Sequence, residues 1–343
     1  IAPYRGSYLL TQEVCRFDPA LALERLQAQQ ELLSIDIGGD KLRSAIYRAR
    51  DGRLEKLSED VYRSSGGAGY LALLERLARQ AAADDLRVGI SSATKLDGSV
   101  VIRTVNLPIF FRELGERYGA DFENLFPGRS FVANDTITGV CGASSRLALD
   151  GNPPRDIAFV ICASGLGGSV IKNETAIHVE VGHVPLVPSL NPLDQTSPCG
   201  VEGRQHVCVE RVTASRAGIE DLYRQQTGES LDGVAIGRLY EQRDELATVL
   251  YETSARALTH ALVGMMERYR FPNSDESVVV LHGGTFEIAR YREAVRRDLD
   301  RIPHPRCRVV FSRDLSDNVC LDGAAVLAAC YAGQVERTSQ VRA

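Results

Sequence analysis

Short apolar or alternating segments and longer amphipathic segments follow one another along the first half of this chain. Alternation of apolar and polar residues predicts a strand, whereas apolar residues at every third or fourth position predict a helix. The strand-like segments are residues 33–37, 43–49, 86–92, 99–105 and 129–135. The helix-like segments are residues 18–33, which open on Asp18 and Pro19, residues 69–83, and residues 136–151, which close on Gly151. Strands that alternate with helices favour an α/β sheet.

The second half of the chain repeats this pattern. Residues 155–173 are expected to form two strands joined by a glycine turn, and a long helical tract spans about residues 234–270. Residues 277–299 follow as a strand, a Gly-Gly turn and a helix, and residues 307–333 add a strand and a helix of small residues. At 343 residues the chain is long enough for two α/β domains that share one cleft.

Three glycine turns each follow an apolar strand. The first lies in "SIDIGGDKLRSAIY", residues 34–47, where two glycines stand between two acids. Paired glycines make tight hairpins between strands, but they also let backbone N–H groups approach a phosphate. This turn alone is compatible with both interpretations. Two further turns, at "SGLGGS" (residues 164–169) and at Gly283-Gly284, favour anion binding, although the chain has neither a Walker A pattern nor a dinucleotide fingerprint.

Composition and charge narrow the classes of partner. The net charge of −5 argues against a nucleic-acid-binding surface. No apolar run approaches the length of about 20 residues that a membrane-spanning helix needs, and the first residues lack the basic start and apolar core of a signal peptide. The eight cysteines are too sparse for a disulfide scaffold, and most stand in apolar settings, as Cys162 and Cys330 do. We therefore expect a cytoplasmic protein that binds neither nucleic acid nor a membrane.

Six short motifs follow one another between about residues 33 and 330. They are Asp36-Ile37-Gly38-Gly39-Asp40-Lys41, Ala133-Asn134-Asp135, Ser164 to Ser169, Glu180-Val181-Gly182-His183, the segment "CGVEGRQHVCVE" from Cys199 to Glu210, and Gly283-Gly284. In this order they resemble the first phosphate motif, the catalytic segment, the second phosphate loop, the Glu–x–Gly–His motif, the cysteine-rich segment and the adenosine-side Gly-Gly of the ROK (repressor, open reading frame, kinase) family of sugar kinases. Together they are far more specific than any one of them alone.

The resemblance implies the actin-like ATPase fold, an α/β fold of the ribonuclease H-like type in which the active site lies in the cleft between two lobes. The small lobe would span residues 1–137 and be rejoined by the C-terminal helix, residues 320–343. The large lobe would span residues 138–320 and carry nucleotide-binding and zinc-loop elements. The resemblance also implies a homodimer.

Each motif has an implied role in phosphoryl transfer from ATP. Asp135 would be the general base that takes the acceptor proton, and Asp36 would orient Mg²⁺ through water. The residues implied at the nucleotide are Asp36, Gly38, Gly39, Asp40, Lys41, Gly165, Gly167, Gly168, Gly283 and Gly284. Those implied at the acceptor are Asn106, Asn134, Asp135, Glu180, His183 and Glu210. Asn134 and Asp135 are also typical helix caps, and Lys41 is also compatible with a solvated strand position, so these interpretations stay open.

The chain departs from the family pattern at three places. Asp40 replaces the threonine of the first phosphate motif and adds a negative charge where phosphates are expected. The glycine-rich loop before Glu180 is shortened to "IKNETAIHV". In the cysteine-rich segment, Ser197 stands where the family has its first cysteine, and about four extra residues precede Cys208.

The cysteine-rich segment also bears on a structural zinc ion. The family holds zinc with one histidine and three cysteines, of which His183, Cys199 and Cys208 are present here. The inserted residues supply His206, and imidazole is a good fourth ligand for tetrahedral zinc. The expected ligands are therefore His183, Cys199, His206 and Cys208, and the alternative is a metal-free loop with two free thiols.

The resemblance thus implies an ATP-dependent kinase that phosphorylates a hydroxyl of a hexose, an aminohexose or a related cyclitol, with ATP, Mg²⁺ and Zn²⁺ as cofactors. Two alternatives stay open. The family includes sugar-responsive repressors, but the residues before Ser34 hold one expected helix, which is too little for a winged helix-turn-helix. The other alternative is a sugar-binding protein of the same family that has lost catalysis, which Asp40 and the shortened loop suggest.

Overall fold

The computed structural model describes residues 14–104, 107–151, 153–191, 195–199, 205–303 and 305–331. The chain forms two compact units, which we name unit 1 and unit 2. Unit 1 combines residues up to Thr138 with Glu174–His178 and the chain from Ala324 onward, and unit 2 combines Gly139–Asn173 with Val179–Gly323.

A mixed sheet forms the centre of unit 1. Its order is β4-β3-β2-β5-β8; the hairpin-connected strands β2, β3 and β4 pair antiparallel, and β2, β5 and β8 pair parallel. The N–H of Gly38 donates to the carbonyl oxygen of Lys41 over 2.9 Å, so the first glycine turn closes a hairpin, as one of its two interpretations predicts. The strands are β2 (Gln30–Ile37), β3 (Lys41–Arg50), β4 (Arg53–Arg63), β5 (Arg87–Ser92) and β8 (Ser130–Asn134).

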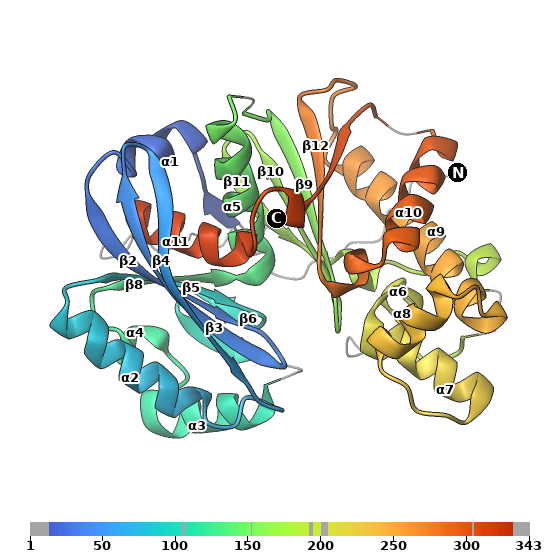
Figure 1. Cartoon of the computed structure of the whole chain (residues 1–343), viewed down its shortest axis with the longest axis horizontal. Coiled ribbons are helices and arrows are strands. Elements are labelled where there is room, and N and C mark those ends of the chain that lie inside the picture. The colour runs from blue at the N-terminus through green and yellow to red at the C-terminus, as the bar shows by residue number, and fades with distance from the viewer. Residues whose placement is uncertain are drawn as a thin grey trace. The chain divides into compact units, whose positions relative to one another are not determined.

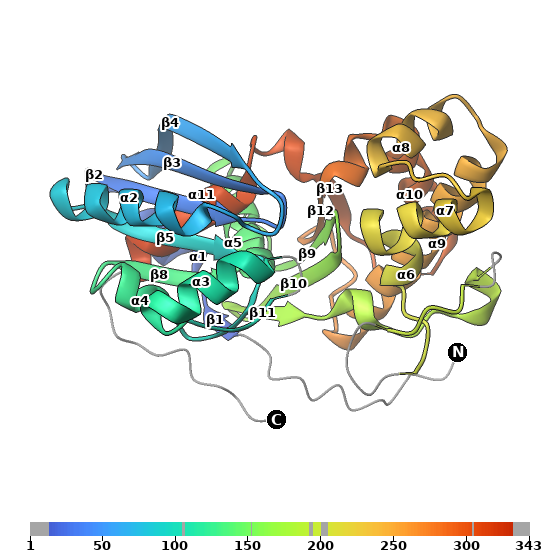
Figure 2. The same cartoon turned by 90° about the horizontal axis from the view of Figure 1, so that it is seen from below.

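Helices cover both faces of this sheet (Figures 1 and 2). Alternate residues of β2 point to opposite faces, and Leu33, Ile35 and Ile37 pack into one buried core with α2, α3 and α4. On the other face lies α11, where Arg87 donates to the carbonyl oxygen of Ala329 over 3.2 Å. The helices are α2 (Tyr70–Ala83), α3 (Pro108–Tyr118), α4 (Phe122–Leu125) and α11 (Val319–Tyr331), which enters unit 1 at Ala324.

Several short elements complete unit 1. Strand β1 pairs antiparallel with β11, and β6 pairs antiparallel with β7. Asp18 caps α1 by accepting a hydrogen bond from the N–H of Ala20 over 2.8 Å. The elements are β1 (Val14–Arg16), α1 (Pro19–Arg25), β6 (Lys95–Asp97), β7 (Val100–Arg103) and β11 (Thr175–Val179).

Unit 2 contains strands β10, β9, β12 and β13, which lie side by side in that order. Strands β9 and β10 form an antiparallel hairpin, whereas β12 pairs parallel with both β9 and β13. The strands are β9 (Asp156–Cys162), β10 (Leu166–Lys172), β12 (Ser277–His282) and β13 (Arg308–Phe311). The α-helices are α5 (Asp135–Leu149), which starts in unit 1, α6 (Glu210–Thr213), α7 (Asp221–Thr227), α8 (Gly233–Glu241), α9 (Glu245–Arg268) and α10 (Ala289–Arg301). Short 3-10 turns span Val181–His183 (η1), Pro188–Leu190 (η2), Gly284–Glu287 (η4) and Ser312–Asp314 (η5), and a π-helical turn spans Ser215–Glu220 (η3).

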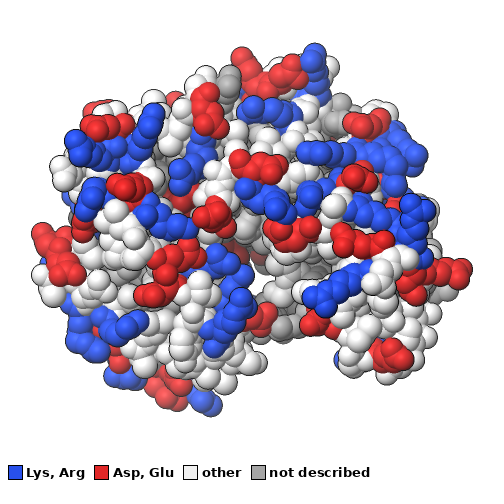
Figure 3. Space-filling model, viewed as in Figure 1, with Lys and Arg blue, Asp and Glu red and all other residues white. Residues whose placement is uncertain are grey.

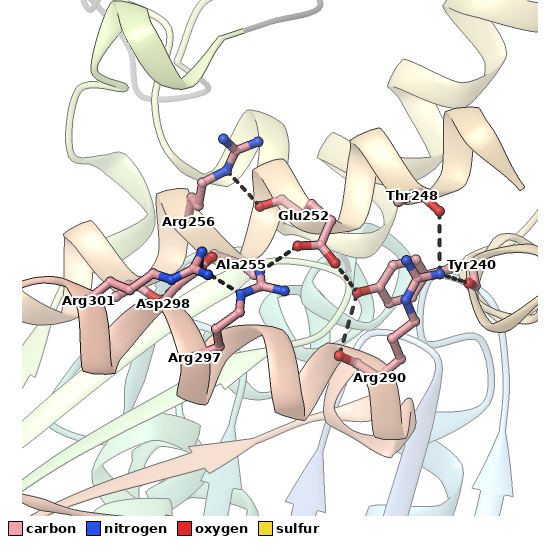
Figure 4. A network of polar contacts seen from close by, with 10 residues as sticks. Tyr240, Thr248, Glu252, Ala255, Arg256, Arg290, Arg297, Asp298 and Arg301 are labelled. Carbon is pink, nitrogen blue, oxygen red and sulfur yellow. Dashed lines mark hydrogen bonds and ion pairs between the residues drawn. The ribbon is translucent and has the colours of Figure 1, made fainter. Parts of the chain in front are cut away.

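A network of polar side chains joins α8, α9 and α10 (Figure 4). Glu252 accepts a hydrogen bond from the hydroxyl of Tyr240 over 2.8 Å and pairs with Arg297 over 2.5 Å. Arg297 also donates to Asp298 over 3.0 Å, and the guanidinium of Arg290 lies 4.2 Å from the ring centroid of Tyr240. Burial by itself would raise the pKa of Glu252, but the hydrogen bonds and charges of its partners outweigh burial and lower that pKa. The network therefore favours the ionised carboxylate and ties the three helices together.

The helix expected over residues 18–33 is wrong in its second half. Helix α1 ends at Arg25, and strand β2 begins at Gln30. Strand β2 forms hydrogen-bonded ladders with both β3 and β5, and these long-range pairings outweigh the local helical pattern.

The helical tract expected over residues 234–270 is two helices rather than one. Between α8 and α9, Arg243 has a φ of 65°, which no α-helix accommodates. Asp244 then caps α9 by accepting a hydrogen bond from the N–H of Ala247 over 2.9 Å. The sequence pattern also missed β4, whose mostly exposed residues show no clear alternation, and α3, which is short and opens on Pro108.

Acidic and basic side chains are interspersed over the face of the molecule shown in Figure 3. All eight cysteines are free thiols, and seven of them are buried. The expectation of buried thiols in apolar settings is confirmed, as at Cys162 and Cys330. Within the described ranges, no helix combines the length and the apolar character that crossing a membrane requires.

Candidate active site

Two adjacent strand ends place Asp36 and Ser91 side by side in unit 1. Asp36 is the next-to-last residue of β2, Ser91 is the next-to-last residue of β5, and the two pair directly in the parallel ladder. Ser91 Oγ donates a hydrogen bond to Asp36 Oδ1 over 2.8 Å. Ser91 is fully buried and Asp36 is partly exposed, so a buried hydroxyl orients a carboxylate that solvent can reach.

Thr138 extends this contact to the backbone of Asp135. The hydroxyl oxygen of Thr138 lies 2.9 Å from Ser91 Oγ and 3.0 Å from the carbonyl oxygen of Asp135. Both Ser91 and Thr138 are fully buried, where an unpaired hydroxyl would be costly. Two buried hydroxyls therefore connect the carboxylate of Asp36 to the residue expected to be the general base.

The Asn-Asp pair lies where β8 ends at Asn134 and α5 begins at Asp135. Asn134 Oδ1 accepts a hydrogen bond from the backbone N–H of Thr136 over 2.9 Å, and its Nδ2 donates to the carbonyl oxygen of Thr94 over 3.2 Å. The helix-cap interpretation of Asn134 is thus confirmed. Asp135 is partly exposed in the first turn of α5, where the helix dipole favours a carboxylate. A carboxylate in this position can accept a proton from a hydroxyl of a bound molecule.

Charges of both signs surround the hairpin turn after β2. Asp40 is exposed at the turn, and Lys41 pairs directly with Arg63 across strands β3 and β4. Burial, followed by the charges of Arg43 and Arg63, lowers the pKa of Lys41, whereas Asp36 and Asp40 act in the opposite direction. Each arginine affects this pKa more than either acid does. The positive charges of Arg43 and Arg63 thus offset the negative charge of Asp40 at the turn. This balance of charge is compatible with an anionic ligand there.

In unit 2, Glu210 joins the second glycine turn to the Glu–x–Gly–His motif. The turn lies between β9 and β10, and the N–H of Leu166 at its end donates to Oε1 of Glu210 over 3.0 Å. The motif's Gly182 packs so closely that a Cβ would lie 2.4 Å from the carbonyl oxygen of Leu166. Packing against the hairpin therefore requires glycine at this position of the motif.

Glu180, His183 and Glu210 form a polar cluster around the short turn η1. Nε2 of His183 lies 3.6 Å from a carboxylate oxygen of Glu180, and its Nδ1 lies 3.8 Å from a carboxylate oxygen of Glu210. All three side chains are partly exposed. Carboxylates accept hydrogen bonds from hydroxyls and an imidazole can donate one, so the cluster can bind a polyhydroxylated molecule.

Three donor atoms of unit 2 could hold a metal ion. One ligand atom from each of His183, Cys199 and Cys208 lies within 4.8 Å of the other two. Sγ of Cys199 is 3.5 Å from Nδ1 of His183, and both thiols are buried. Burial, followed by the neighbouring Cys199, raises the pKa of Cys208 to about 12. Imidazole and thiolate groups are the ligands that zinc prefers, so this donor set fits zinc.

His206 lies beside this group but not within it. Its Nε2 is 3.2 Å from the carbonyl oxygen of His183, and its own carbonyl oxygen accepts a hydrogen bond from the N–H of Cys199 over 2.8 Å. The imidazole of His206 therefore contacts backbone rather than the three donor atoms. The structure brings together three of the four expected ligands and leaves His206 at their edge.

Gly283 begins the turn that leads from β12 to η4. Its φ is 118°, and a Cβ there would lie 2.1 Å from the carbonyl oxygen of Cys162, so only glycine fits. The turns after β9 and β12 thus adjoin at the carboxyl ends of two parallel strands, where open α/β sheets commonly bind ligands.

Four side chains around Asn134 and Asp36 were not among the site residues expected from the sequence: Ser91, Thr136, Thr138 and His178. The signal for Ser91 is its place at the polar end of an otherwise apolar strand. Thr136 and Thr138 follow the catalytic segment directly and fall in the first turn of α5. Nothing local marks His178, which reaches this region only through the pairing of distant segments. Asn106, expected at the acceptor, lies outside the described residues.

Comparison with known proteins identifies relatives over most of the chain. Residues 32–330 match the model of the ROK family. No curated protein sequence matches the chain.

Among solved structures, the chain is similar to a ROK hexokinase from Thermus thermophilus, with 24% identity, 87% of this chain and 97% of that chain covered, and a TM-score of 0.61. It is similar to a ROK family glucokinase from Streptomyces griseus in complex with glucose and AMPPNP, with 20% identity, 87% and 99% covered, and a TM-score of 0.61. It is also similar to a ROK family transcriptional regulator, a homologue of the E. coli MLC protein, with 18% identity, 88% and 79% covered, and a TM-score of 0.57. These similarities confirm the actin-like ATPase fold expected from the sequence.

Proposed function

The chain belongs to the ROK family, and on this premise we propose that it is an ATP-dependent kinase of a hexose, an aminohexose or a related cyclitol. Sugar kinases and a transcriptional regulator both occur among the structures similar to it. Family membership therefore does not distinguish a kinase from a regulator, and the proposal rests on the chain's own residues.

The connection between Asp36 and Asp135 is the observation that carries this proposal. Phosphoryl transfer depends on how the reacting groups are positioned. The acid that orients the metal and the base that takes the acceptor proton must therefore be held at a fixed distance from each other. Contacts of 2.8, 2.9 and 3.0 Å lead from the carboxylate of Asp36 through the hydroxyls of Ser91 and Thr138 to the backbone carbonyl oxygen of Asp135.

Asp135 is the proposed general base. Its carboxylate takes the proton of the acceptor hydroxyl while the acceptor oxygen bonds to the γ-phosphorus and the bond to the ADP oxygen breaks. Asn134, Glu180, His183 and Glu210 are the groups proposed to bind the remaining hydroxyls, together with Asn106 from the sequence. Since polar groups left unpaired in a site penalise analogues that lack a hydroxyl, these residues would set acceptor selectivity.

The nucleotide is assigned to the glycine turns. Mg²⁺, when bound with ATP, neutralises phosphate charge, and Asp36 is the residue proposed to orient it through water. The residues proposed at the phosphates are Gly38, Gly39, Asp40, Lys41, Gly165, Gly167 and Gly168, and those proposed at adenosine are Gly283 and Gly284. Gly283 packs so closely against Cys162 that no side chain fits at this position. A turn that begins without a side chain leaves its backbone open to a ligand, which supports the assignment of Gly283 to adenosine.

A structural zinc ion is part of the proposal. His183, Cys199 and Cys208 would hold it, as their mutual distances within 4.8 Å support. His206 is the fourth ligand proposed from the sequence, and its ring would have to turn away from the carbonyl oxygen of His183 to serve. Zinc would fix the loop that leads to Glu210 and thereby the acceptor cluster.

A sugar-binding protein without catalysis is the second candidate. Asp40 favours it, since an exposed acid at the first phosphate turn opposes a triphosphate electrostatically. The similarity to a transcriptional regulator points in the same direction. The presence of both Asp135, the proposed base, and Asp36, the acid proposed to orient Mg²⁺, weighs against this second candidate.

A coupled assay of ADP release separates the two candidates. The panel is glucose, mannose, glucosamine, N-acetylated hexosamines, kanosamine and cyclitols, each with MgATP. We expect ADP release that depends on one class of acceptor and disappears without Mg²⁺. Binding of a sugar measured by calorimetry, without ADP release for any acceptor, would favour the second candidate. A homodimer and a cytoplasmic location stay predictions, and light scattering tests the first of them.

A further inference from the structure

His178 of β11 contacts the cap of the helix that begins with Asp135. Its Nδ1 lies 2.9 Å from the hydroxyl oxygen of Thr136. The same hydroxyl donates to Oδ1 of Asn134 over 2.8 Å. All of these residues belong to unit 1, although His178 stands 42 positions after Thr136 in the sequence.

The directions of these hydrogen bonds follow from the number of protons available. The atom of the Asn134 amide that faces the backbone N–H of Thr136 must be an acceptor, which fixes it as Oδ1 and directs Nδ2 to the carbonyl oxygen of Thr94. The hydroxyl of Thr136 has one hydrogen and donates it to that Oδ1. It can therefore only accept from His178, so His178 carries its proton on Nδ1.

The result is a directed chain from His178 through Thr136 to the amide of Asn134. Oδ1 of Asn134 accepts two hydrogen bonds, from the N–H and the hydroxyl of Thr136, and both of its lone pairs are used. The side chain of Thr136 is 98% buried, as its residue exposure of 2% indicates, so its hydroxyl cannot turn to solvent for another partner. A histidine from a distant segment therefore contacts the hydroxyl that donates to Asn134.

We propose that His178 is a positioning residue of the acceptor site, which holds the Asn134 amide beside Asp135 through the hydroxyl of Thr136. This inference rests on the proposed kinase function. His178 lies in the segment "IKNETAIHV" that shortens the loop before Glu180, so this histidine belongs to a part of the chain where the family pattern changes.

The donor position on the histidine ring gives the proposal a sharp test. The amide nitrogen of asparagine occupies roughly the place of Nδ1, whereas that of glutamine reaches roughly the place of Nε2. His178→Asn keeps a donor for Thr136, while His178→Gln and His178→Ala do not. We expect His178→Ala and His178→Gln to lower kcat/KM for the acceptor on the order of tenfold, with KM for ATP changed less than about twofold. His178→Asn should restore kcat/KM to within about threefold of the wild type.

Thr136 supplies a second pair of variants. Thr136→Ser keeps the hydroxyl, and Thr136→Val replaces it by a methyl group of similar size. We expect Thr136→Val to lower kcat/KM for the acceptor as much as His178→Ala does. The double variant should lose no more than either single variant, because both substitutions break the same chain of hydrogen bonds. His260→Asn in α9 is the control for exchanging a half-buried histidine elsewhere, and it should behave as the wild type.

A readout without catalysis completes the test. In protein labelled with ¹⁵N-histidine, NMR should show one resonance with a protonated Nδ1 that disappears in His178→Asn. A wild-type His178 protonated only on Nε2 overturns the inference whatever the activity. Wild-type activity together with unchanged acceptor kinetics in a folded His178→Ala also overturns it, whereas a wild type that phosphorylates no acceptor refutes the proposed function and the positioning role with it.

Discussion

Ser91 donates a hydrogen bond to Asp36 over 2.8 Å, and the two residues pair directly across the ladder of β2 and β5. The serine is fully buried and the carboxylate is partly exposed, so the sheet itself determines where the acid points. This contact is the first step of the connection that ends at the backbone of Asp135.

Replacing Ser91 by alanine tests that contact. We expect Ser91→Ala to lower the free energy of unfolding by roughly 1–2 kcal/mol, because a carboxylate oxygen of Asp36 and the buried hydroxyl of Thr138 each lose a hydrogen-bond partner. It should also raise KM for ATP more than KM for the acceptor. Ser144→Ala is the matched control, since Ser144 is fully buried and its hydroxyl has no hydrogen-bond partner among the described residues. Equal losses in both variants would mean that the Ser91 contact adds nothing beyond burial.

Asp135→Asn removes the proposed proton acceptor while it keeps the shape of the side chain. We expect turnover to fall on the order of 10² to 10⁴, the usual loss for a general base. Acceptor binding measured by calorimetry should survive, because the amide of Asn134 and the cluster around His183 are unchanged. Near-normal turnover in the folded variant would exclude Asp135 as the base.

Asp40→Thr tests the charge at the first phosphate turn. Removing an exposed acid beside the proposed phosphate site should lower KM for ATP by roughly two- to tenfold at low salt, with a smaller effect at high salt. Asp60→Thr, an exposed acid on β4 of the same unit, is the control and should change KM little. A rise in KM for Asp40→Thr would instead give Asp40 a positive role, such as in orienting the metal.

Elemental analysis tests the zinc site. Protein purified without added metal or chelators should contain about one zinc per chain, as a single site of imidazole and thiolate ligands implies. Cys208→Ser should lose the metal and most of the activity. Cys307→Ser, a half-buried thiol outside the group, should keep both. Metal-free protein with full activity would refute the site.

Glu252 predicts a pH dependence of stability. Its pKa in the folded protein is below the ordinary 4.5, so the stabilisation that it provides is fully present above pH 4.5 and is lost as the pH falls through the folded-state pKa. Glu252→Gln should lower the free energy of unfolding at pH 7 by roughly 1–3 kcal/mol and flatten the decline in acid. Denaturant unfolding at several pH values between 3 and 7 gives the free energy of unfolding and thus measures both effects. The exposed Glu267 of α9 provides the control variant Glu267→Gln, which should follow the wild type.

The sequence by itself determined the elements whose patterns are local. The apolar run before Gly38, the helical period over residues 69–83 and the first two glycine turns predict strands, a helix and hairpins that the structure contains. The order of the motifs was enough to identify the family and its fold. Such features can be read from the sequence because a turn or an amphipathic face needs only neighbouring residues.

Only the tertiary structure decided which polar side chains meet. The hydroxyl of Ser91 reaches Asp36 across 55 positions of sequence, and His178 reaches Thr136 across 42. Likewise, the ladders of β2 with its two neighbours turned residues 30–33 from an expected helix into a strand. Side-chain hydrogen bonds and strand pairings between distant segments depend on how whole elements pack, and no local pattern of apolar and polar residues encodes that packing.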